Sequence, residues 1–333
     1  MKKTLIIILT LLLSFTLVAC GSSGSSQTKE ESDKSASGSK PITIRLSGAF
    51  AEGTDHYYYF ETFCKSVYER SNGTVTVVWG HGPEAIPSNQ LAEAMQNGMV
   101  ELVYTPLAYT VTVIPGFAGM KLTDAATMRA SGGVDYVNSI TTDKLKAHYL
   151  GRTQDGSYFV LGMNKEVDSL DDFKGLSIRG TSATKPLISS LGAEMVTMGW
   201  ADVYQALEKN VVQGAGGTLK DFVDNDLGRV LKTLVLPGVY NSDSSLLIAN
   251  HVWDKLDDVQ KDAIIQSAID WEKDSLRKNQ ADNEKNIATL KEAGVKVVDL
   301  GEEYKKAAYE AAWKEAEKAD AEVAAKLRSY AGM

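Results

Sequence analysis

Short runs suited to strands alternate with helical patterns along most of the chain. Strand side chains point alternately to opposite faces, whereas apolar positions on a helix recur every three or four residues. Strands are predicted over residues 43–50, 74–80, 100–105, 158–164, 176–180, 193–198 and 211–217. Helices are predicted over residues 56–70 and 88–98 and near 184–192 and 201–209. This alternation predicts an α/β fold in which helices cover the sheets.

The C-terminal part of the chain has a different pattern. Residues 253–291 are rich in Asp, Lys, Gln and Ala and predict one long helix. A further strand is predicted over residues 295–300, and residues 302–329 predict a last amphipathic helix.

Two distant segments share one helix–turn–strand pattern. Residues 91–106 (LAEAMQNGMVELVYTP) align without gaps on residues 203–218 (VYQALEKNVVQGAGGT), although few positions are identical. As a repeat this is weak, but the shared pattern predicts two lobes of similar design.

Ligands of open α/β sheets bind beyond the carboxyl ends of strands. Two facing lobes would therefore direct Thr105 from one side, and Gly216 and Gly217 from the other, into a shared cleft. Arg179 also stands at the end of an apolar strand, in FKGLSIRG. A half-buried guanidinium needs an anion beside it, either a neighbouring carboxylate or a ligand.

The N-terminal residues predict export and a lipid anchor. Lys2 and Lys3 precede a 14-residue apolar stretch, which is typical of a secretory signal and short for a membrane span. The stretch ends in LVAC, which resembles the bacterial lipobox and implies cleavage after residue 19 and lipid attachment to Cys20. The alternative is an ordinary signal peptide. Residues 20–40 supply the lipidated cysteine and a Ser/Gly-rich flexible linker.

Charge and cysteine content narrow the function further. The formal net charge is −8, and loss of two lysines with residues 1–19 would make it −10. Such a net negative charge argues against binding to nucleic acid and against electrostatic binding to anionic lipid. Beyond Cys20 the chain has only Cys64, so no disulfide can form within the mature chain.

Catalytic and metal-binding patterns are weak. Ser182 and Lys185 form a Ser-x-x-Lys tetrapeptide, but the partner motifs of the enzymes that use it are missing. The four histidines have no metal-ligand spacing, and the glycines of GAGGTLK lack the ending of a phosphate loop. We therefore expect no catalytic residues, no metal and no cofactor.

Two longer stretches carry a family resemblance. Residues 170–214, LDDFKGLSIRGTSATKPLISSLGAEMVTMGWADVYQALEKNVVQG, are similar to a segment of the solute-binding proteins of TRAP transporters, of the DctP type. Residues 246–264, LLIANHVWDKLDDVQKDAI, resemble a later segment of the same family. The resemblance covers essentially residues 41–333.

The resemblance implies a two-lobed fold like that of periplasmic binding proteins, with a ligand cleft between the lobes and long bracing C-terminal helices. Lobe I would comprise residues 41–157 and about 247–290, and lobe II residues 158–246 and about 291–333. Arg179 matches the family arginine that holds the ligand carboxylate. The implied partners are a small organic acid and the TRAP permease subunits, in an extracytoplasmic, lipid-anchored protein.

Departures from the family pattern indicate the kind of acid. Many members carry a second arginine where this chain has Phe159, and a family Asn falls at Gly217. Loss of polar anchors favours a monocarboxylate over a dicarboxylate. Trp200 and Tyr109 are candidates, with Phe159, for contact with an aromatic or apolar tail, or are ordinary core residues.

Other roles stay open from the sequence. Arg152, in LGRTQDG, either supplies a replacement charge or lies on the surface. Thr105 and Tyr109 are the expected contacts from the lobe opposite Arg179. The alternative functions are a binding lipoprotein of another importer or a sensory receptor for organic acids and, as a further alternative, a secreted hydrolase using Ser182.

Overall fold

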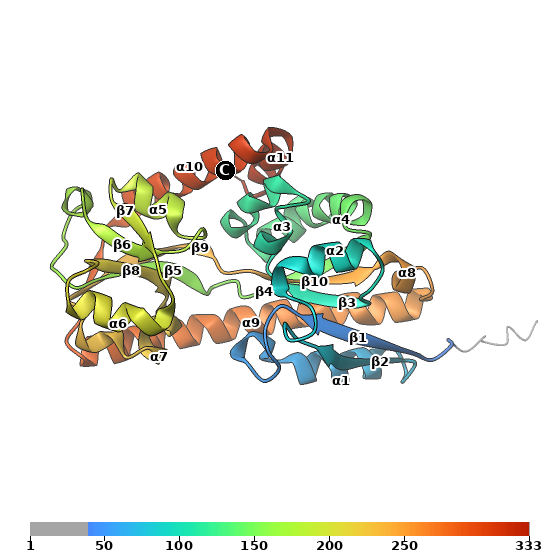
Figure 1. Ribbon diagram of the computed structural model, residues 1–333. Coiled ribbons are helices and arrows are strands. Elements are labelled where there is room, and N and C mark those ends of the chain that lie inside the picture. Colours follow the sequence, from blue (N-terminus) through green and yellow to red (C-terminus); the bar gives the residue numbers. More distant parts are fainter. Residues whose placement is uncertain (1–38, 333) are drawn as a thin grey trace, which may run out of the picture. The chain divides into compact units, whose positions relative to one another are not determined.

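The computed structural model describes residues 39–332, which contain two β-sheets with helices packed around them (Figure 1). The signal peptide, Cys20 and most of the linker expected over residues 20–40 lie outside the described residues. We call the part built around the first sheet lobe I and the part built around the second sheet lobe II.

Lobe I holds a five-stranded sheet in the order β2-β1-β3-β10-β4. Its strands are β1 (Ile42–Gly48), β2 (Val75–His81), β3 (Leu102–Thr105), β4 (Ala147–Thr153) and β10 (Ser244–Ala249). Strand β1 is parallel to β2 and β3, whereas β10 is antiparallel to both of its neighbours. The helices of this lobe are α1 (Phe60–Arg70), α2 (Leu91–Gln96), α3 (Ala125–Ser131), α4 (Gly133–Lys144) and α8 (Asn250–Trp253), with short turns η1 (Asp55–Tyr57), η2 (Ser88–Gln90), η3 (Leu107–Thr110) and η4 (Pro115–Leu122).

Lobe II holds a six-stranded sheet in the order β11-β9-β5-β8-β6-β7. Its strands are β5 (Tyr158–Met163), β6 (Ser177–Gly180), β7 (Glu194–Thr197), β8 (Gly214–Thr218), β9 (Thr233–Asn241) and β11 (Lys296–Asp299). Strand β6 is parallel to β7 and β8, and β5 is antiparallel to β8 and β9. The helices are α5 (Lys185–Ser190), α6 (Trp200–Glu208) and α7 (Leu219–Asp224), with turns η5 (Leu170–Phe173) and η6 (Leu227–Arg229).

Long helices near the C-terminus contact both lobes. Helix α9 (Asp258–Glu292) has 35 residues and packs against α1 and β4 of lobe I and against α7 of lobe II (Figure 1). Helix α10 (Gly301–Ala319) contacts η4 of lobe I and α5 and β9 of lobe II, and α11 (Ala321–Tyr330) contacts η4 and α3. The two-lobed α/β fold with bracing helices is thus confirmed. The residue ranges expected for the two lobes stay a prediction.

Aromatic packing fixes α9 against lobe I. The rings of Trp271 and Tyr104 stack with centroids 5.2 Å apart, and the Trp271 indole nitrogen donates to the Tyr58 carbonyl at 2.7 Å. Both side chains are buried at 3 % exposure or less. This contact buries a large apolar area on the face of α9 that meets the first sheet.

Three predicted helices have different boundaries in the structure. The last helix, expected over 302–329, is two helices because Asp320 is extended and its carboxylate accepts a hydrogen bond from the Val323 amide. The long helix starts later than 253 because Asp257 caps it in a capping box with Gln260. The helix expected over 56–70 is interrupted at Tyr59, whose φ of 67° is left-handed.

Candidate functional site

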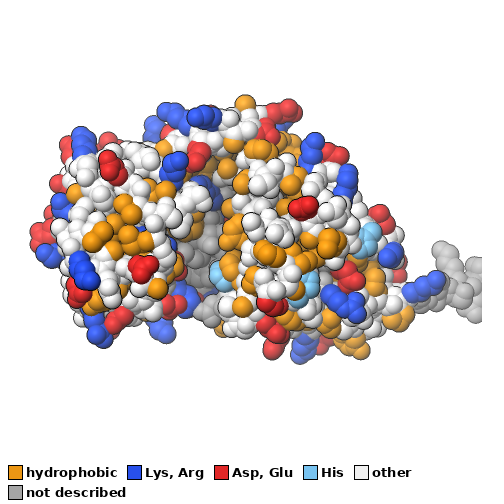
Figure 2. All heavy atoms as spheres, in the orientation of Figure 1, with side chains coloured by type: hydrophobic (Ala, Val, Ile, Leu, Met, Phe, Trp, Pro, Cys, Tyr) orange, Lys and Arg blue, Asp and Glu red, His pale blue; other side chains and the backbone are white. Residues whose placement is uncertain are grey.

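A cavity of about 560 Å³ lies between the lobes, where Figure 2 shows the surface hollowed. Lobe I contributes η3 and η4, lobe II contributes Phe159 and the loop after β6, and α10 closes one side. Pro106 follows β3 and Thr181 follows β6, so the carboxyl end of one strand from each sheet faces the cavity. This is the position at which open α/β sheets bind ligands.

Arg179 is buried at the end of β6, two residues before the loop that lines the cavity. Its side chain is held by the protein backbone: Nε donates to the Met198 carbonyl and Nη1 to the Gly216 carbonyl, both at 3.1 Å. The guanidinium lies 3.9 Å from the centre of the Trp200 ring. This arrangement fixes the direction of the planar group.

Within residues 39–332, no carboxylate forms an ion pair with Arg179. The residue is only 4 % exposed, and burial lowers its pKa, an effect that Asp221 opposes from a distance. A buried guanidinium keeps its proton, so its charge is left without a direct partner. The site therefore has the chemistry of an anion receptor.

The two glycines of β8 make room for this arrangement. A Cβ on Gly217 would lie 2.5 Å from the Trp200 ring, and one on Gly216 would lie 3.2 Å from Thr184. Trp200 can stack on Arg179 only because β8 has no side chain at position 217. The structure thus brings Arg179, Trp200, Gly216 and Gly217 together, but none of the four lines the cavity: they lie behind the loop of Thr181 to Ala183, which does.

Replacing Gly217 by Ala should weaken acid binding roughly tenfold, because the added methyl displaces Trp200 from the guanidinium it holds. Gly199→Ala is the matched control, since a Cβ there meets nothing within 4 Å. The measurement is the Kd of the two variants for the same acid by titration calorimetry. Equal affinities for both would show that Trp200 does not position Arg179.

The aromatic candidates lie on both walls of the cavity. Phe159 lines it from lobe II, and Tyr109 lines it from η3 of lobe I with 40 % exposure. Thr105 is buried beside them but does not line the cavity, and its hydroxyl lies 3.4 Å from the Pro106 carbonyl. The cavity lining is therefore largely apolar, and both lobes contribute aromatic side chains to it.

Arg152 lies in β4 and is fully buried, so the expectation of a surface position is wrong. Its Nε donates to Asp155 at 2.7 Å, and its Nη1 donates to the Met120 carbonyl at 2.7 Å and to the Thr123 hydroxyl at 3.0 Å. The ion pair with Asp155 balances the charge of Arg152 inside the protein. Arg152 does not line the cavity, and its donors serve the structure of lobe I.

Three charged residues that the sequence did not predict line the cavity: Lys121, Asp243 and Glu315 of α10. Lys121 lies in η4 and donates to the Ala183 carbonyl of lobe II at 3.0 Å, and Asp243 lies in the connection from β9 to β10. A lone lysine within the apolar run GFAGMKL was the available signal for the first. Nothing near Asp243 in the sequence marks it, because its surroundings come from distant segments.

Lys121 should make stability depend on pH. Burial lowers its pKa from 10.5 to about 8, although Glu315 and Asp243 oppose the effect. The folded protein therefore holds this proton less tightly than the unfolded chain, and stability rises as the pH increases from about 8 to 10.5. In Lys121→Met this rise should be smaller by roughly 2–4 kcal/mol. Urea unfolding of both proteins across this range measures it, and parallel curves would contradict it.

The Ser-x-x-Lys tetrapeptide lies at the cavity without a catalytic arrangement. Ser182 lines the cavity and Lys185 begins α5, but no hydrogen bond joins their side chains in residues 39–332. The N-cap of α5 is Thr184. Over the same residues, no group of three or more His, Cys, Asp or Glu could hold a metal ion.

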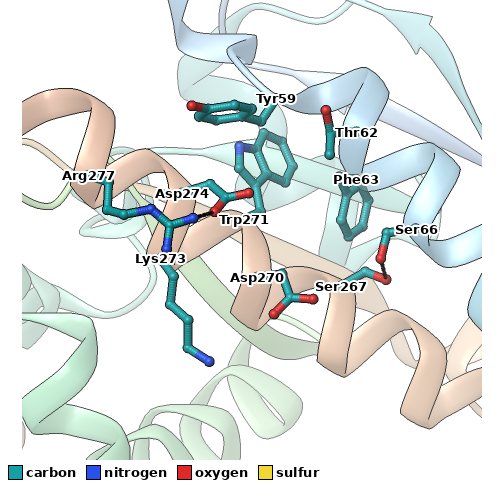
Figure 3. A pocket seen from close by; sticks show the side chains of 10 residues that line it. All are labelled: Tyr59, Thr62, Phe63, Ser66, Ser267, Asp270, Trp271, Lys273, Asp274 and Arg277. Carbon is teal, nitrogen blue, oxygen red and sulfur yellow. Dashed lines mark hydrogen bonds and ion pairs between the residues drawn. The ribbon is translucent and has the colours of Figure 1, made fainter.

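A second pocket of about 230 Å³ lies between α1 and α9 of lobe I (Figure 3). Two pairs join its polar side chains: Arg277 with Asp274, and the Ser66 hydroxyl with that of Ser267 at 2.8 Å. Asp270 pairs with Arg70 at 2.7 Å. These pairs leave less unmatched charge than the surroundings of Arg179. No helix of the described chain is both long and apolar enough to cross a membrane.

Comparison with known proteins identifies the family of this chain. The family described as bacterial extracellular solute-binding protein, family 7, matches residues 46–322. A solute-binding protein of Verminephrobacter eiseniae is 24 % identical over 267 residues, covering 77 % of this chain and 79 % of the relative. A monocarboxylate 2-oxoacid-binding periplasmic protein of Nostoc is 23 % identical over 282 residues, covering 80 % and 76 %.

The fold also resembles solved structures. A TRAP periplasmic solute-binding protein from Rhodobacter sphaeroides, in an open form without ligand, has a TM-score of 0.75 at 18 % identity. The match covers 87 % of this chain and 97 % of that protein.

Proposed function

This chain belongs to family 7 of the bacterial extracellular solute-binding proteins, and from that premise we propose that it captures an organic acid through Arg179. It is a solute-binding protein of the TRAP, DctP type. The observation that carries the proposal is the buried Arg179 guanidinium, which has no carboxylate partner in the described chain. Arg179 does not itself line the cavity between the lobes but stands two residues before Thr181, which does.

The physical reason is the match between guanidinium and carboxylate. The two can form parallel charge-assisted hydrogen bonds, which fix both the charge and the orientation of the ligand. Nε and Nη1 of Arg179 each serve a backbone carbonyl, while Nη2 has no partner among residues 39–332. Ligand binding would therefore use Nη2 and the second proton of Nη1.

The class of acid follows from the other cavity residues. Phe159 and Tyr109 supply apolar surface from the two lobes. We infer a monocarboxylate with an aromatic or apolar tail, and the Nostoc relative is named for binding monocarboxylate 2-oxoacids. Trp200 lies behind the guanidinium and would act by orienting it.

Capture would involve closure of the lobes around the acid. The chain crosses between lobes after β4 and after β9, and α9 runs along both. A ligand favours the closed form only if it contacts both lobes there, as an acid held by Arg179 and Tyr109 would. The closed form would then deliver the acid to the TRAP permease subunits.

We also propose that lipid on Cys20 anchors the protein outside the cell membrane. The LVAC sequence supports this, and residues 20–40 would serve as the tether. Cys20→Ser should move the protein from the membrane fraction to the soluble extracytoplasmic fraction. Membrane retention of this variant would contradict the anchor.

Thermal unfolding of residues 39–333 with a panel of organic acids tests the function. An acid at a hundred times its Kd should add about 2.7 kcal/mol and raise Tm by about 4–5 °C. The matched primary amides are the control, because they keep the shape and lose the charge. Stabilisation by the amides as strongly as by the acids, or by neither, would overturn the proposal.

A further inference from the structure

We propose that Asp243 is a second recognition group of the same cavity and selects acids whose far end carries a hydrogen-bond donor, most favourably an ammonium group. This inference rests on the proposed function, because it takes the acid carboxylate to be held by Arg179. It adds that the ligand is an amino or hydroxy acid rather than a plain monocarboxylate. It also assigns a residue of lobe I to ligand choice.

Asp243 lies where the chain passes from lobe II to lobe I, at the wall of the cavity. It belongs to the two-residue connection between β9 of lobe II and β10 of lobe I, and it lines the cavity. Asp243 is 7 % exposed, and its Oδ2 accepts a hydrogen bond from the Leu107 amide at 3.0 Å. That amide belongs to η3, so the carboxylate is fixed to the wall of lobe I.

The carboxylate has unused capacity. An ionised carboxylate offers about four acceptor sites, and Oδ1 of Asp243 has no hydrogen bond within residues 39–332. Burial raises the pKa of Asp243, an effect that Arg152 and Lys121 oppose through their charges. Neither cation donates a hydrogen bond to it: Arg152 pairs with Asp155, and Lys121 donates to the Ala183 carbonyl. A buried carboxylate is costly unless it is paired or hydrogen-bonded, so a donor from the ligand would be strongly favoured.

Arg179 and Asp243 belong to different lobes, so they would bind opposite ends of the ligand. Arg179 is part of the sheet of lobe II, whereas Asp243 is tied to η3 of lobe I. An acid with a distal donor would therefore contact both lobes through charged groups. Such contacts form together only when the lobes close, which couples ligand choice to closure.

The charge of the molecule favours the same chemistry. The whole chain carries a formal net charge of −8, which repels a free anion. A zwitterion has no net charge and avoids this repulsion. Its ammonium group also balances Asp243 once both are removed from water.

Matched probes test this by titration calorimetry on residues 39–333. Each donor-bearing acid is compared with the unsubstituted acid of the same length: γ-aminobutyrate, δ-aminovalerate and ε-aminocaproate with butyrate, valerate and caproate. The ω-hydroxy acids, and para-hydroxyphenylacetate beside phenylacetate, form the second arm. We expect at least one donor-bearing acid to bind roughly ten- to a hundredfold tighter than its match.

Two variants assign the effect to one carboxylate. Asp243→Asn keeps an oxygen for the Leu107 amide and removes the charge, so the preference for the ammonium acid should fall to about threefold or less. Glu303→Gln is the control, because Glu303 is an exposed carboxylate of α10 outside the cavity and should leave the preference intact. Glu315 is the other carboxylate that lines the cavity, so loss of the preference in Glu315→Gln instead of Asp243→Asn would overturn the inference. If Asp243→Asn does not fold, Asp243→Ser replaces it.

The outcomes separate this inference from the proposed function. Equal affinity for substituted and plain acids, with both lost in Arg179→Ala, would overturn the inference and leave the function standing. Tightest binding of succinate, glutarate or adipate would also overturn it, because Lys121 would then bind the second carboxylate of the ligand. Binding of no acid at all would overturn the proposed function itself.

Discussion

Replacing Arg179 by Ala should weaken acid binding more than a hundredfold, because two charge-assisted hydrogen bonds of about 1.5–3 kcal/mol each are lost. The guanidinium is 4 % exposed and is stacked on Trp200, so no neighbouring cation replaces it directly. The measurement is the Kd of the best acid of the panel by titration calorimetry. Affinity equal to that of the parent protein would show that Arg179 is only structural.

Two controls make this result specific. Arg179→Lys keeps the charge but loses the planar pair of donors, so its affinity should lie between those of the parent and the alanine variant. Arg179→Ala also removes the donors to the Met198 and Gly216 carbonyls, so its Tm without ligand should fall even where it remains folded. Its loss of affinity is therefore measured below that Tm, where circular dichroism shows the variant to be folded.

Replacing Asp155 by Ala should lower the free energy of unfolding by about 3–5 kcal/mol, because it leaves the Arg152 charge buried and unpaired. Arg152 is 1 % exposed and Asp155 is 5 % exposed. Asp155 also accepts a hydrogen bond from the Ala125 amide at 2.5 Å, which begins α3. Urea unfolding at neutral pH, followed by far-UV circular dichroism, measures the change.

The double variant Arg152→Met with Asp155→Ala is the matched control. It removes both charges, so the buried uncompensated guanidinium is gone and part of the lost stability should return. A double variant less stable than Asp155→Ala would contradict this account of the pair. Acid binding should be largely preserved in the double variant, because both side chains belong to lobe I and neither hydrogen-bonds to Arg179.

Local patterns predicted most of the elements and the centre of the site. The alternation of apolar positions is a property of neighbouring residues, so strands such as β6 and β8 were expected close to their observed ranges. Arg179 could be found because a charge at the end of an apolar strand is visible in eight residues. Its partners Gly216 and Gly217 follow from the rule that strand ends meet in a cleft.

What the sequence did not predict depends on distant contacts. Arg152 seemed to stand in a loop, yet its donors and its amide are bonded by nearby Asp155 and by two distant segments, which supply Met120 with Thr123 and Glu272. Asp243 and Lys121 meet at the cavity because η4 and the β9–β10 connection pack together. The break at Asp320 was missed because the flanking Ala- and Glu-rich stretches both favour helix.

The most direct test is a crystal structure of residues 39–333 with the tightest-binding acid of the panel. The account predicts the acid between closed lobes, with its carboxylate oxygens within hydrogen-bond distance of Nη1 and Nη2 of Arg179. Its tail should lie between Phe159 and Tyr109. An acid bound with its carboxylate away from Arg179, or bound outside the cavity between the lobes, would contradict the central claim.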